Sequence, residues 1–275
     1  MKANILTFIL WLLLLTAPVL AQDTLQAPLL RYSHSIAIGS PTAISQDRTG
    51  NIYLLDKGQN LLRLNPLGQP IDTYSPPARG RFNSIHAWNP MKIQLFYEGS
   101  QRIVLLDRFL RPISSFDIME INNQNTSKLA APAADVGYWL FNETTLTLTK
   151  FNPIAQEATV ETPLNLLLNR EQFDVRQLRE YQNQVYLLDY NSGIFVFDNL
   201  GNYKTKLPYT AVRHMAFRGN ELYFVKDNKL HFVDLYTQAT KELLLDSSKK
   251  YVSALVGEEA IFLFTSNTVD IYFAK

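Results

Sequence analysis

The chain has 275 residues, a formal net charge of +1 and no cysteine. Residues 1–21 contain one lysine and no acidic residue, so residues 22–275 carry 25 basic and 25 acidic side chains. This balance argues against nucleic acid or an anionic membrane surface as the main partner, because both select an excess of positive charge. The lack of cysteine excludes disulfides and thiolate metal sites.

The first 21 residues have the pattern of a secretory signal peptide. Lys2 is positively charged, residues 5–15 are almost wholly apolar, and Val19 and Ala21 are small residues before a cleavage site after Ala21. A membrane anchor is the alternative, but the apolar core of about 11 residues is short of the roughly 20 that span a bilayer. We expect export, to the periplasm, the periplasmic face of the outer membrane or the cell surface. The absence of cysteine favours these bacterial locations over a eukaryotic secretory route.

A turn motif follows an apolar run five times along the chain. The motif is an apolar residue, Asn or Asp, any residue, an apolar residue, any residue and a polar residue, with the Asn or Asp at positions 65, 107, 152, 198 and 234. Asn and Asp side chains accept hydrogen bonds from the backbone two residues further on and start tight turns. Gly68 and Gly201 supply a positive φ without steric cost. Each copy therefore predicts a hairpin turn between two strands.

An apolar strand precedes each of these turns and occurs once more near the C-terminus. Equivalent residues of these strands lie at positions 53, 94, 138, 186, 223 and 261. Several are apolar on both faces, which fits a sheet packed between two others. A period near 40 residues with several short strands per unit is typical of a β-propeller. The sequence therefore predicts an all-β fold, a six-bladed β-propeller formed by residues 22–275 as a single domain.

The last unit of this pattern is incomplete. Its strand at residues 269–273 reaches the C-terminus with no turn and no fourth strand, while the strand-like residues 29–38 have no partner near the first unit. We expect the N-terminal segment to be the outer strand of the sixth blade, because this 3+1 closure leaves no open sheet edge in the ring. A disordered N-terminal tail is the alternative, which its apolar content disfavours.

The innermost strand of each blade is expected to line a central channel. One link between blades, residues 164–171, reads as a short helix or a lid over one face. The candidates for the inner strands are residues 42–45, 83–88, 129–134, 175–179, 212–217 and 252–256.

Residues 47–56, DRTGNIYLLD, followed by NLLRL at 60–64, resemble a repeat of the NHL type. Residues 184–189 match the same motif in part, whereas the third unit has Asn142 in place of its Asp. The resemblance implies a six-bladed propeller, similar to small exported propellers of Bacteroidetes-type bacteria, and only loosely a function.

Calcium-dependent gluconolactonase-type hydrolases share this resemblance, and in them a Glu, Asn residues and an Asp bind a channel metal through hard oxygen ligands. Their Glu-Gly-Pro and Pro-Asp-Gly motifs are absent here, and residues 41–45 contain no acid. We expect no metal and no cofactor.

Two histidines, His86 and His214, lie on predicted inner strands. Histidines on neighbouring channel strands can serve as acid and base or hold a metal. The alternative is that they are polar lining of a water-filled channel. His231 is expected on a strand that faces a gap between blades.

Basic residues in two links are candidate binding groups. Arg79 and Arg81 precede the second blade, and Lys249 and Lys250 precede the sixth. Such links are expected on the face that propellers use for binding, where a guanidinium can hold a carboxylate; solvated loops are the alternative. Trp88, at the end of an inner strand, favours peptide or sugar contact if it is exposed.

These features favour a non-catalytic, exported scaffold that binds protein partners in the cell envelope. An accessory subunit of an outer-membrane secretion, assembly or uptake complex is a suitable role. The alternatives are a lyase or hydrolase that uses His86 and His214, and a module that binds a peptide or glycan. No nucleic-acid partner and no direct membrane span are expected.

Overall fold

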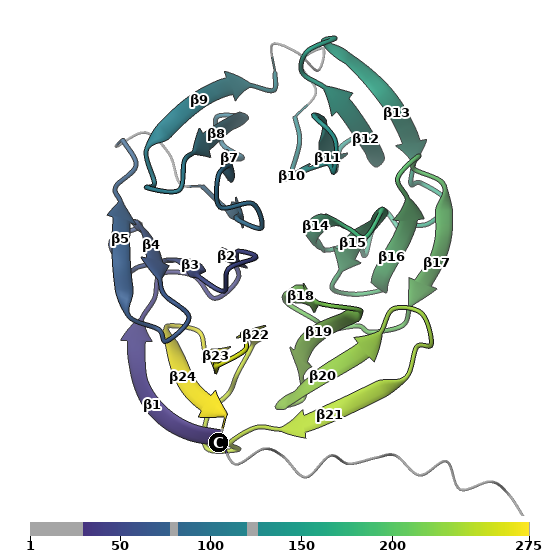
Figure 1. The fold of residues 1–275 in the computed structure, drawn as a ribbon. Coiled ribbons are helices and arrows are strands. Elements are labelled where there is room, and N and C mark those ends of the chain that lie inside the picture. Colours follow the sequence, from purple (N-terminus) through teal and green to yellow (C-terminus); the bar gives the residue numbers. More distant parts are fainter. Residues whose placement is uncertain (1–29, 78–81, 120–125, 275) are drawn as a thin grey trace, which may run out of the picture.

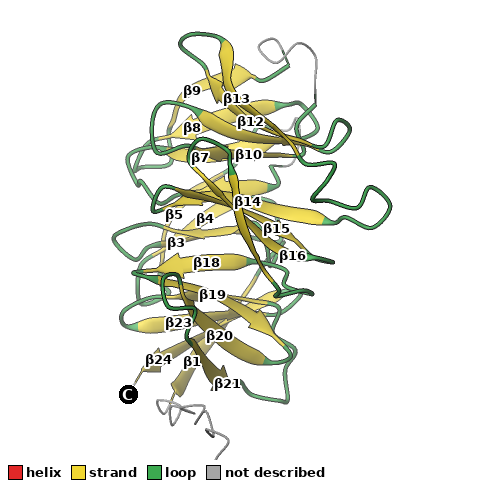
Figure 2. Ribbon diagram, turned by 90° about the vertical axis from the view of Figure 1, so that its right-hand side faces the viewer, coloured by secondary structure: helices red, strands yellow, loops and turns green. Residues whose placement is uncertain are grey.

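The structure is a computed structural model that describes residues 30–77, 82–119 and 126–274. This part of the chain forms 24 β-strands and contains no α-helix (Figure 2). It therefore offers no helix long and apolar enough to cross a bilayer. The predicted signal peptide, residues 1–21, lies outside the described residues.

The strands form six four-stranded sheets arranged around a central axis (Figure 1), which confirms the six-bladed β-propeller. Five sheets follow the chain in order, and the sixth combines both ends of the chain. The first sheet, from the centre outward, is β2 (Ile44–Gln46), β3 (Ile52–Leu55), β4 (Leu61–Leu64) and β5 (Pro70–Tyr74). The second is β6 (Ser84–His86), β7 (Ile93–Tyr97), β8 (Arg102–Leu106) and β9 (Pro112–Asp117). The third is β10 (Leu129–Pro132), β11 (Tyr138–Asn142), β12 (Thr147–Asn152) and β13 (Glu157–Pro163).

The fourth sheet is β14 (Val175–Tyr181), β15 (Gln184–Asp189), β16 (Gly193–Asp198) and β17 (Tyr203–Leu207). The fifth is β18 (Met215–Arg218), β19 (Glu221–Lys226), β20 (Lys229–Asp234) and β21 (Thr240–Leu244). The sixth is β22 (Ser253–Val256), β23 (Ala260–Phe264), β24 (Thr268–Ala274) and, outermost, β1 (Leu30–Ala37). Each predicted inner strand overlaps the innermost strand of its sheet.

The antiparallel order within each sheet gives the propeller two distinct ends. Loops after the first strand and turns after the third lie at one end, which we call the turn face: residues 47–51, 87–92, 133–137, 182–183, 219–220 and 257–259, with the turns at 65–69, 107–111, 152–156, 198–202 and 234–239. The links that carry the chain from one sheet to the next lie at the opposite end, which we call the link face. A hydrogen bond from Tyr236 Oη to Gln182 Oε1 (3.2 Å) joins a turn to a loop on the turn face.

All five turns have the hydrogen bonds that the sequence predicts. In each, the side-chain oxygen of the Asn or Asp accepts the backbone N–H two residues on, as in Asn65 to Leu67 (2.9 Å). Gly68 and Gly201 have φ of 80° and 81°. A Cβ at Gly68 would lie 2.5 Å from Ile271 Cδ1 in the sixth sheet, so a larger residue there would displace this side chain.

Residues 164–171 were expected to form a short helix or a lid, and the helix alternative is wrong. This link forms consecutive turns, because the backbone N–H groups of Leu167 and Leu168 both bond to the Leu164 carbonyl and Asn169 then starts a new turn through its side chain. Leu164 and Leu168 are buried in the core between the third and fourth sheets. Their burial anchors the link to the third and fourth sheets.

Every interface between adjacent sheets contains a hydrogen bond between a side chain of one sheet and the backbone of the next. The polar side chains lie on the first or second strand from the channel, so the sheets are joined on their inner side as well as through their apolar cores. The pairs are Ser45 with Ala87, Gln94 with Ala130, Glu180 with Ala134, Gln177 with Met215, Tyr223 with Val256 and Ser253 with Pro41.

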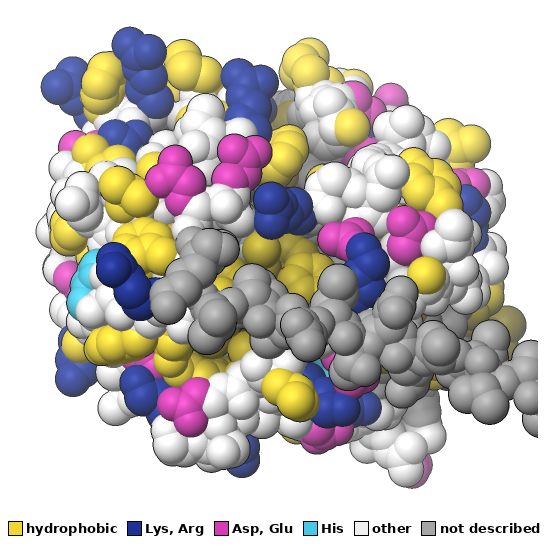
Figure 3. Space-filling view, turned by 60° about the horizontal axis from the view of Figure 1, so that its bottom comes forward, with side chains coloured by type: hydrophobic (Ala, Val, Ile, Leu, Met, Phe, Trp, Pro, Cys, Tyr) yellow, Lys and Arg dark blue, Asp and Glu magenta, His cyan; other side chains and the backbone are white. Residues whose placement is uncertain are grey.

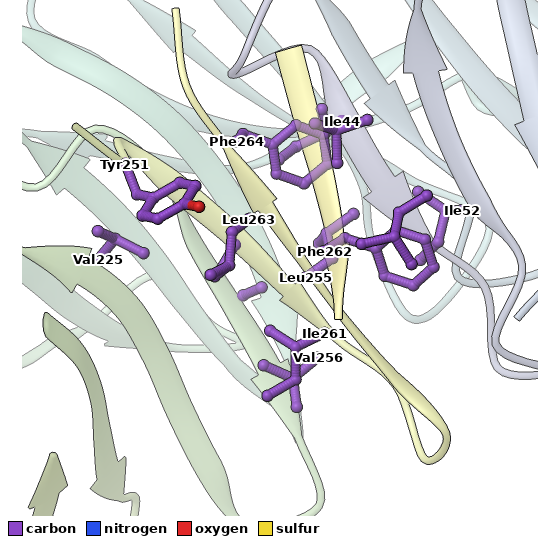
Figure 4. Close-up of a cluster of buried hydrophobic side chains, with 14 of the residues drawn as sticks. Ile44, Ile52, Val225, Tyr251, Leu255, Val256, Ile261, Phe262, Leu263 and Phe264 are labelled. Carbon is purple, nitrogen blue, oxygen red and sulfur yellow. The ribbon is translucent and has the colours of Figure 1, made fainter. Parts of the chain in front are cut away.

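The apolar core at the meeting point of the chain ends is continuous across three sheets. Ile44 and Ile52 of the first sheet lie in one buried cluster with Phe262 and Phe264 of the sixth and Val225 of the fifth (Figure 4). On the outside, Lys and Arg side chains are interspersed with Asp and Glu across the surface seen in Figure 3, as the balanced charge leads one to expect.

Pairing of β1 with β24 closes the ring, as the sequence analysis expects. The register runs from Leu30 opposite Ala274 to Ala37 opposite Thr268, with a bulge between Tyr32 and His34. The side chain of Asp270 in β24 is fully buried. It accepts hydrogen bonds from Lys249 Nζ (2.6 Å), from Tyr251 Oη (2.8 Å) and from Ser35 of β1. We call Ser35, Lys249, Tyr251 and Asp270 the seam cluster.

Burial alone would raise the pKa of Asp270, but the hydrogen bonds from Lys249, Ser35 and Tyr251 outweigh it and hold the pKa below its ordinary 3.8. Since the folded-state pKa is lower than the unfolded one, the ionised carboxylate stabilises the fold above the ordinary pKa. This stabilisation is lost as the pH falls through the folded-state value.

Replacing Asp270 by Asn is expected to lower the free energy of unfolding by about 2–3 kcal/mol, because Lys249 loses its anionic partner. Urea unfolding of residues 22–275 at pH 7 measures this loss. Lys241→Ala is the matched control: Lys241 pairs with Glu221 at 3.3 Å on the surface, and its removal should cost less than about 1 kcal/mol. Equal stabilities of the Asp270→Asn variant and the parent would rule out a stabilising role for the seam cluster.

Candidate functional site

A cavity of about 620 Å³ lies at the turn-face end of the central channel. The loops after the inner strands of the first four sheets form its wall. Arg48, Trp88 and Lys92 come from the first two loops, and all three are exposed. Tyr181 and Arg179, at the end of β14, complete the side of the cavity formed by the fourth sheet.

The space toward the link face is much smaller. A space of about 50 Å³ lies there, lined in part by Arg213 and His214. His86 lines both spaces and so lies at their boundary. The larger space of the channel therefore lies at the turn face and the smaller one toward the link face, with His86 between them.

His86 lines the smaller space together with His214 and the larger cavity together with Arg179. Burial, reinforced by the positive charge of Arg179, lowers the pKa of each imidazole from 6.5 to about 3. His214 is 4% exposed, and its Nδ1 is buried without a hydrogen-bond partner. Both rings are therefore neutral at physiological pH. His231 differs, because it stacks on Phe224 within the fifth sheet and lies 3.2 Å from Glu242.

Arg179 has no hydrogen bond or ion pair to any residue in the described part of the chain; its guanidinium lies 5.6 Å from the ring centre of Phe217. The two acids that line the cavity already have other partners. Asp135 pairs with Lys150 at 2.7 Å, and Glu180 accepts hydrogen bonds from Trp139 Nε1 (2.6 Å) and the Ala134 N–H (3.1 Å). Burial lowers the pKa of Arg179, yet a guanidinium stays charged in proteins. Arg179 is therefore a charged group in the wall of the cavity without an ion-pair partner in the described part of the chain.

Aromatic rings form the wall beside this charge. Trp88 is 49% exposed and meets Tyr181 edge to face, with 6.2 Å between ring centres. Tyr181 in turn stacks on Phe217 at 4.6 Å, which fixes its plane. Trp88 is thus exposed, which is the condition under which it favours peptide or sugar contact.

The other candidate binding residues lie elsewhere. Lys249 belongs to the seam cluster, where Asp270 neutralises its charge. Lys250 is exposed in the same link, at the opposite end of the inner strands from Trp88. Arg79 and Arg81 lie outside the described residues. The cavity of about 620 Å³ lies at the turn face, whereas the sequence analysis expected binding at the link face, where Arg213 and His214 line the space of about 50 Å³.

No group of three His, Asp or Glu side chains within residues 30–77, 82–119 and 126–274 is arranged to hold a metal ion. The sequence analysis did not identify Arg179 as a site residue, although it placed it on an inner strand. The available signal was the position of Arg179 itself, a charged residue on a strand expected to line the channel.

No protein-family model and no curated protein matches the sequence. Solved structures of similar fold include virginiamycin B lyase from Staphylococcus aureus, with 10% identity, a TM-score of 0.61 and coverage of 88% of this chain and 99% of the lyase. The WD40 domain of Pan2 from Neurospora crassa has 9% identity, a TM-score of 0.61 and coverage of 91% and 97%. BBS1N, solved in complex with ARL6DN, has 11% identity, a TM-score of 0.55 and coverage of 90% and 98%. At such identities these similarities show the β-propeller fold alone.

The buried histidines predict a pH dependence of stability. Their folded-state pKa of about 3 lies below the ordinary 6.5, so in this window the unfolded chain binds protons that the folded chain excludes. The free energy of unfolding should therefore fall as the pH falls from 6.5, and it should fall less steeply in the His86→Asn, His214→Asn double variant. Urea unfolding across this range measures both slopes.

Ring-proton NMR of the parent provides an independent check. The signals of His86 and His214 should not move between pH 7 and 5. Titration of both rings near their ordinary pKa would contradict the buried, neutral pair.

Proposed function

We propose that this chain is a non-catalytic binding module that holds a protein partner on its turn face. The observation that carries the proposal is a ring of exposed apolar side chains there. In all five turns the residue two positions after the Asn or Asp is apolar, and its exposed fraction is between 40% and 78%. These residues are Leu67, Phe109, Ile154, Leu200 and Tyr236.

The turn itself does not need an apolar side chain at this position. Only the backbone N–H of the residue takes part in the hydrogen bond to the Asn or Asp. Trp88, Met91 and Val136 add three more exposed apolar side chains closer to the axis, on loops of the same face. Apolar residues gathered on one face of a soluble domain are typical of a protein–protein interface.

The channel histidines fit this role better than catalysis. Neither His86 nor His214 has a hydrogen bond to an Asp or Glu in the described part of the chain, so neither ring has a carboxylate to orient it as a general base. Charged Arg179 beside them opposes their protonation. The lyase among the similar structures shares the fold only.

We place the partner in a bacterial cell envelope, at the periplasmic face of the outer membrane or on the cell surface. The support is the signal-peptide pattern of residues 1–21 and the cysteine-free composition. We also propose an NHL-type repeat for the first sheet and an origin in Bacteroidetes-type bacteria. In that repeat the carboxylate of Asp47 accepts hydrogen bonds from Thr49, Asn51 and Tyr53, which gives its motif residues a structural role.

Partner capture tests the proposal. Immobilised residues 22–275 should retain a stoichiometric partner from envelope extracts, and Phe109→Ser with Ile154→Ser and Leu200→Ser should reduce its retention by about tenfold or more, as expected for interface anchors. The matched control replaces Ile113, Tyr203 and Leu244, exposed on the outer strands, with Ser and should retain the partner. Failure of the parent protein to retain any partner, or equal losses in both triple variants, would refute turn-face binding.

A further inference from the structure

We infer that the turn-face cavity is a carboxylate-binding site, in which Arg179 holds an acidic side chain from an extended segment of the protein partner. This inference rests on the proposed function and names the chemistry of the ligand. It assigns a role to Arg179, which no hydrogen bond or ion pair within the described residues explains.

The charges in the cavity favour an anion. Arg179 is unpaired within the described residues, while Asp135 and Glu180 are held by Lys150 and by Trp139 with Ala134. Arg48 and Lys92 stand at the mouth with exposed side chains, and neither forms an ion pair in the described part of the chain. A guanidinium in a partly enclosed site binds a carboxylate with two parallel charge-assisted hydrogen bonds.

The two histidines leave Arg179 as the group that holds the carboxylate. A neutral imidazole has one N–H donor, and His86 and His214 already hydrogen-bond the backbone of Ala130 and Ile44. His214 Nδ1 is buried without a hydrogen-bond partner. Arg179 therefore supplies the hydrogen bonds to the carboxylate at the floor of the cavity.

The cavity has room for a ligand larger than a simple anion. At about 620 Å³ it falls within the roughly 300–1,000 Å³ of ligand pockets. Its volume matches about 20 water molecules at ~30 Å³ each. Trp88 and Tyr181 offer aromatic surface for apolar atoms next to the carboxylate. A short extended peptide supplies both the carboxylate and the apolar atoms next to it.

A protein source is favoured over an acidic glycan by the surroundings of the cavity. The exposed apolar side chains of the turn face encircle its mouth, and a protein that covers them brings its own segment over the channel. Glycan rings stack on open aromatic faces, whereas Trp88 and Tyr181 meet edge to face in the wall.

A binding role also predicts an unusual effect on stability. An unpaired, enclosed charge destabilises the folded state, so Arg179→Met should raise the melting temperature of residues 22–275 while it abolishes anion binding. A purely structural arginine would behave in the opposite way. A lower melting temperature for Arg179→Met would therefore count against the inference.

The site is tested first with acetate alone. In an NMR titration of isotope-labelled residues 22–275, the Nε–Hε signal of Arg179 should shift saturably with sodium acetate and not with sodium chloride at equal ionic strength. The backbone signals of the cavity should respond in Arg170→Gln, a control at an exposed arginine, and not in Arg179→Gln. Equal responses to acetate and chloride, or an unchanged response in Arg179→Gln, would overturn the site.

The source of the carboxylate is tested with three probes, followed through the fluorescence of Trp88, the exposed one of the two tryptophans in residues 22–275. Acetyl-Leu-Glu-Tyr-Leu-amide should bind about tenfold tighter than its Gln counterpart, the discrimination expected when a site built for a charged group loses it. It should also bind more tightly than trigalacturonate. Tighter binding of trigalacturonate would overturn the peptide assignment in favour of a glycan.

Partner capture with Arg179→Gln separates this inference from the proposed function. Loss of the partner in this variant supports the inference. Retention of the partner would overturn the inference and leave the proposed function standing. Acetate binding by a protein that captures no partner would refute the proposed function and, with it, the assignment of the carboxylate to a partner.

Discussion

The pairing of β1 with β24 is the constraint on which the rest of the molecule depends. The sixth sheet has four strands only because the N-terminal strand joins three from the C-terminus. With the ring closed, each sheet packs between two neighbours, and the bond from Ser253 to the Pro41 carbonyl completes the series of links around the axis. The width of the channel is a consequence of this closure. The cavity is formed by loops from four different sheets, so its shape depends on the relative positions of these sheets.

Much of this architecture follows from local chemistry that a sequence displays. The turn hydrogen bonds involve neighbouring residues, so the five Asn and Asp positions predict them directly. Closure was also predictable, because each chain end has a strand without a partner and pairing these two strands leaves no open edge in the ring. The expected helix at 164–171 failed, since its leucines suit a helix and a buried link equally well, and only packing between two sheets decides between them.

The site was harder to predict because it depends on long-range pairing. The local sequence does not distinguish Lys249 from an exposed lysine. In the fold, however, the buried Asp270 of β24 lies beside it and neutralises its charge. Arg179 is the converse case: the fold brings no acid to it, and that absence within the described residues is visible only in three dimensions. Which end of the channel has the larger space also depends on how residues from different sheets are placed around it. Periodicity locates the inner strands but not the shape of the space between them.

Amide hydrogen exchange along β1 tests the closed ring most directly. In residues 22–275, the amides of Leu30–Ala37 that bond to β24 should exchange as slowly as those of Thr268–Ala274, because both strands open only when the sixth sheet unfolds. Exchange of β1 at the rate of an unstructured peptide, while β24 stays protected, would contradict ring closure and with it the geometry of the channel.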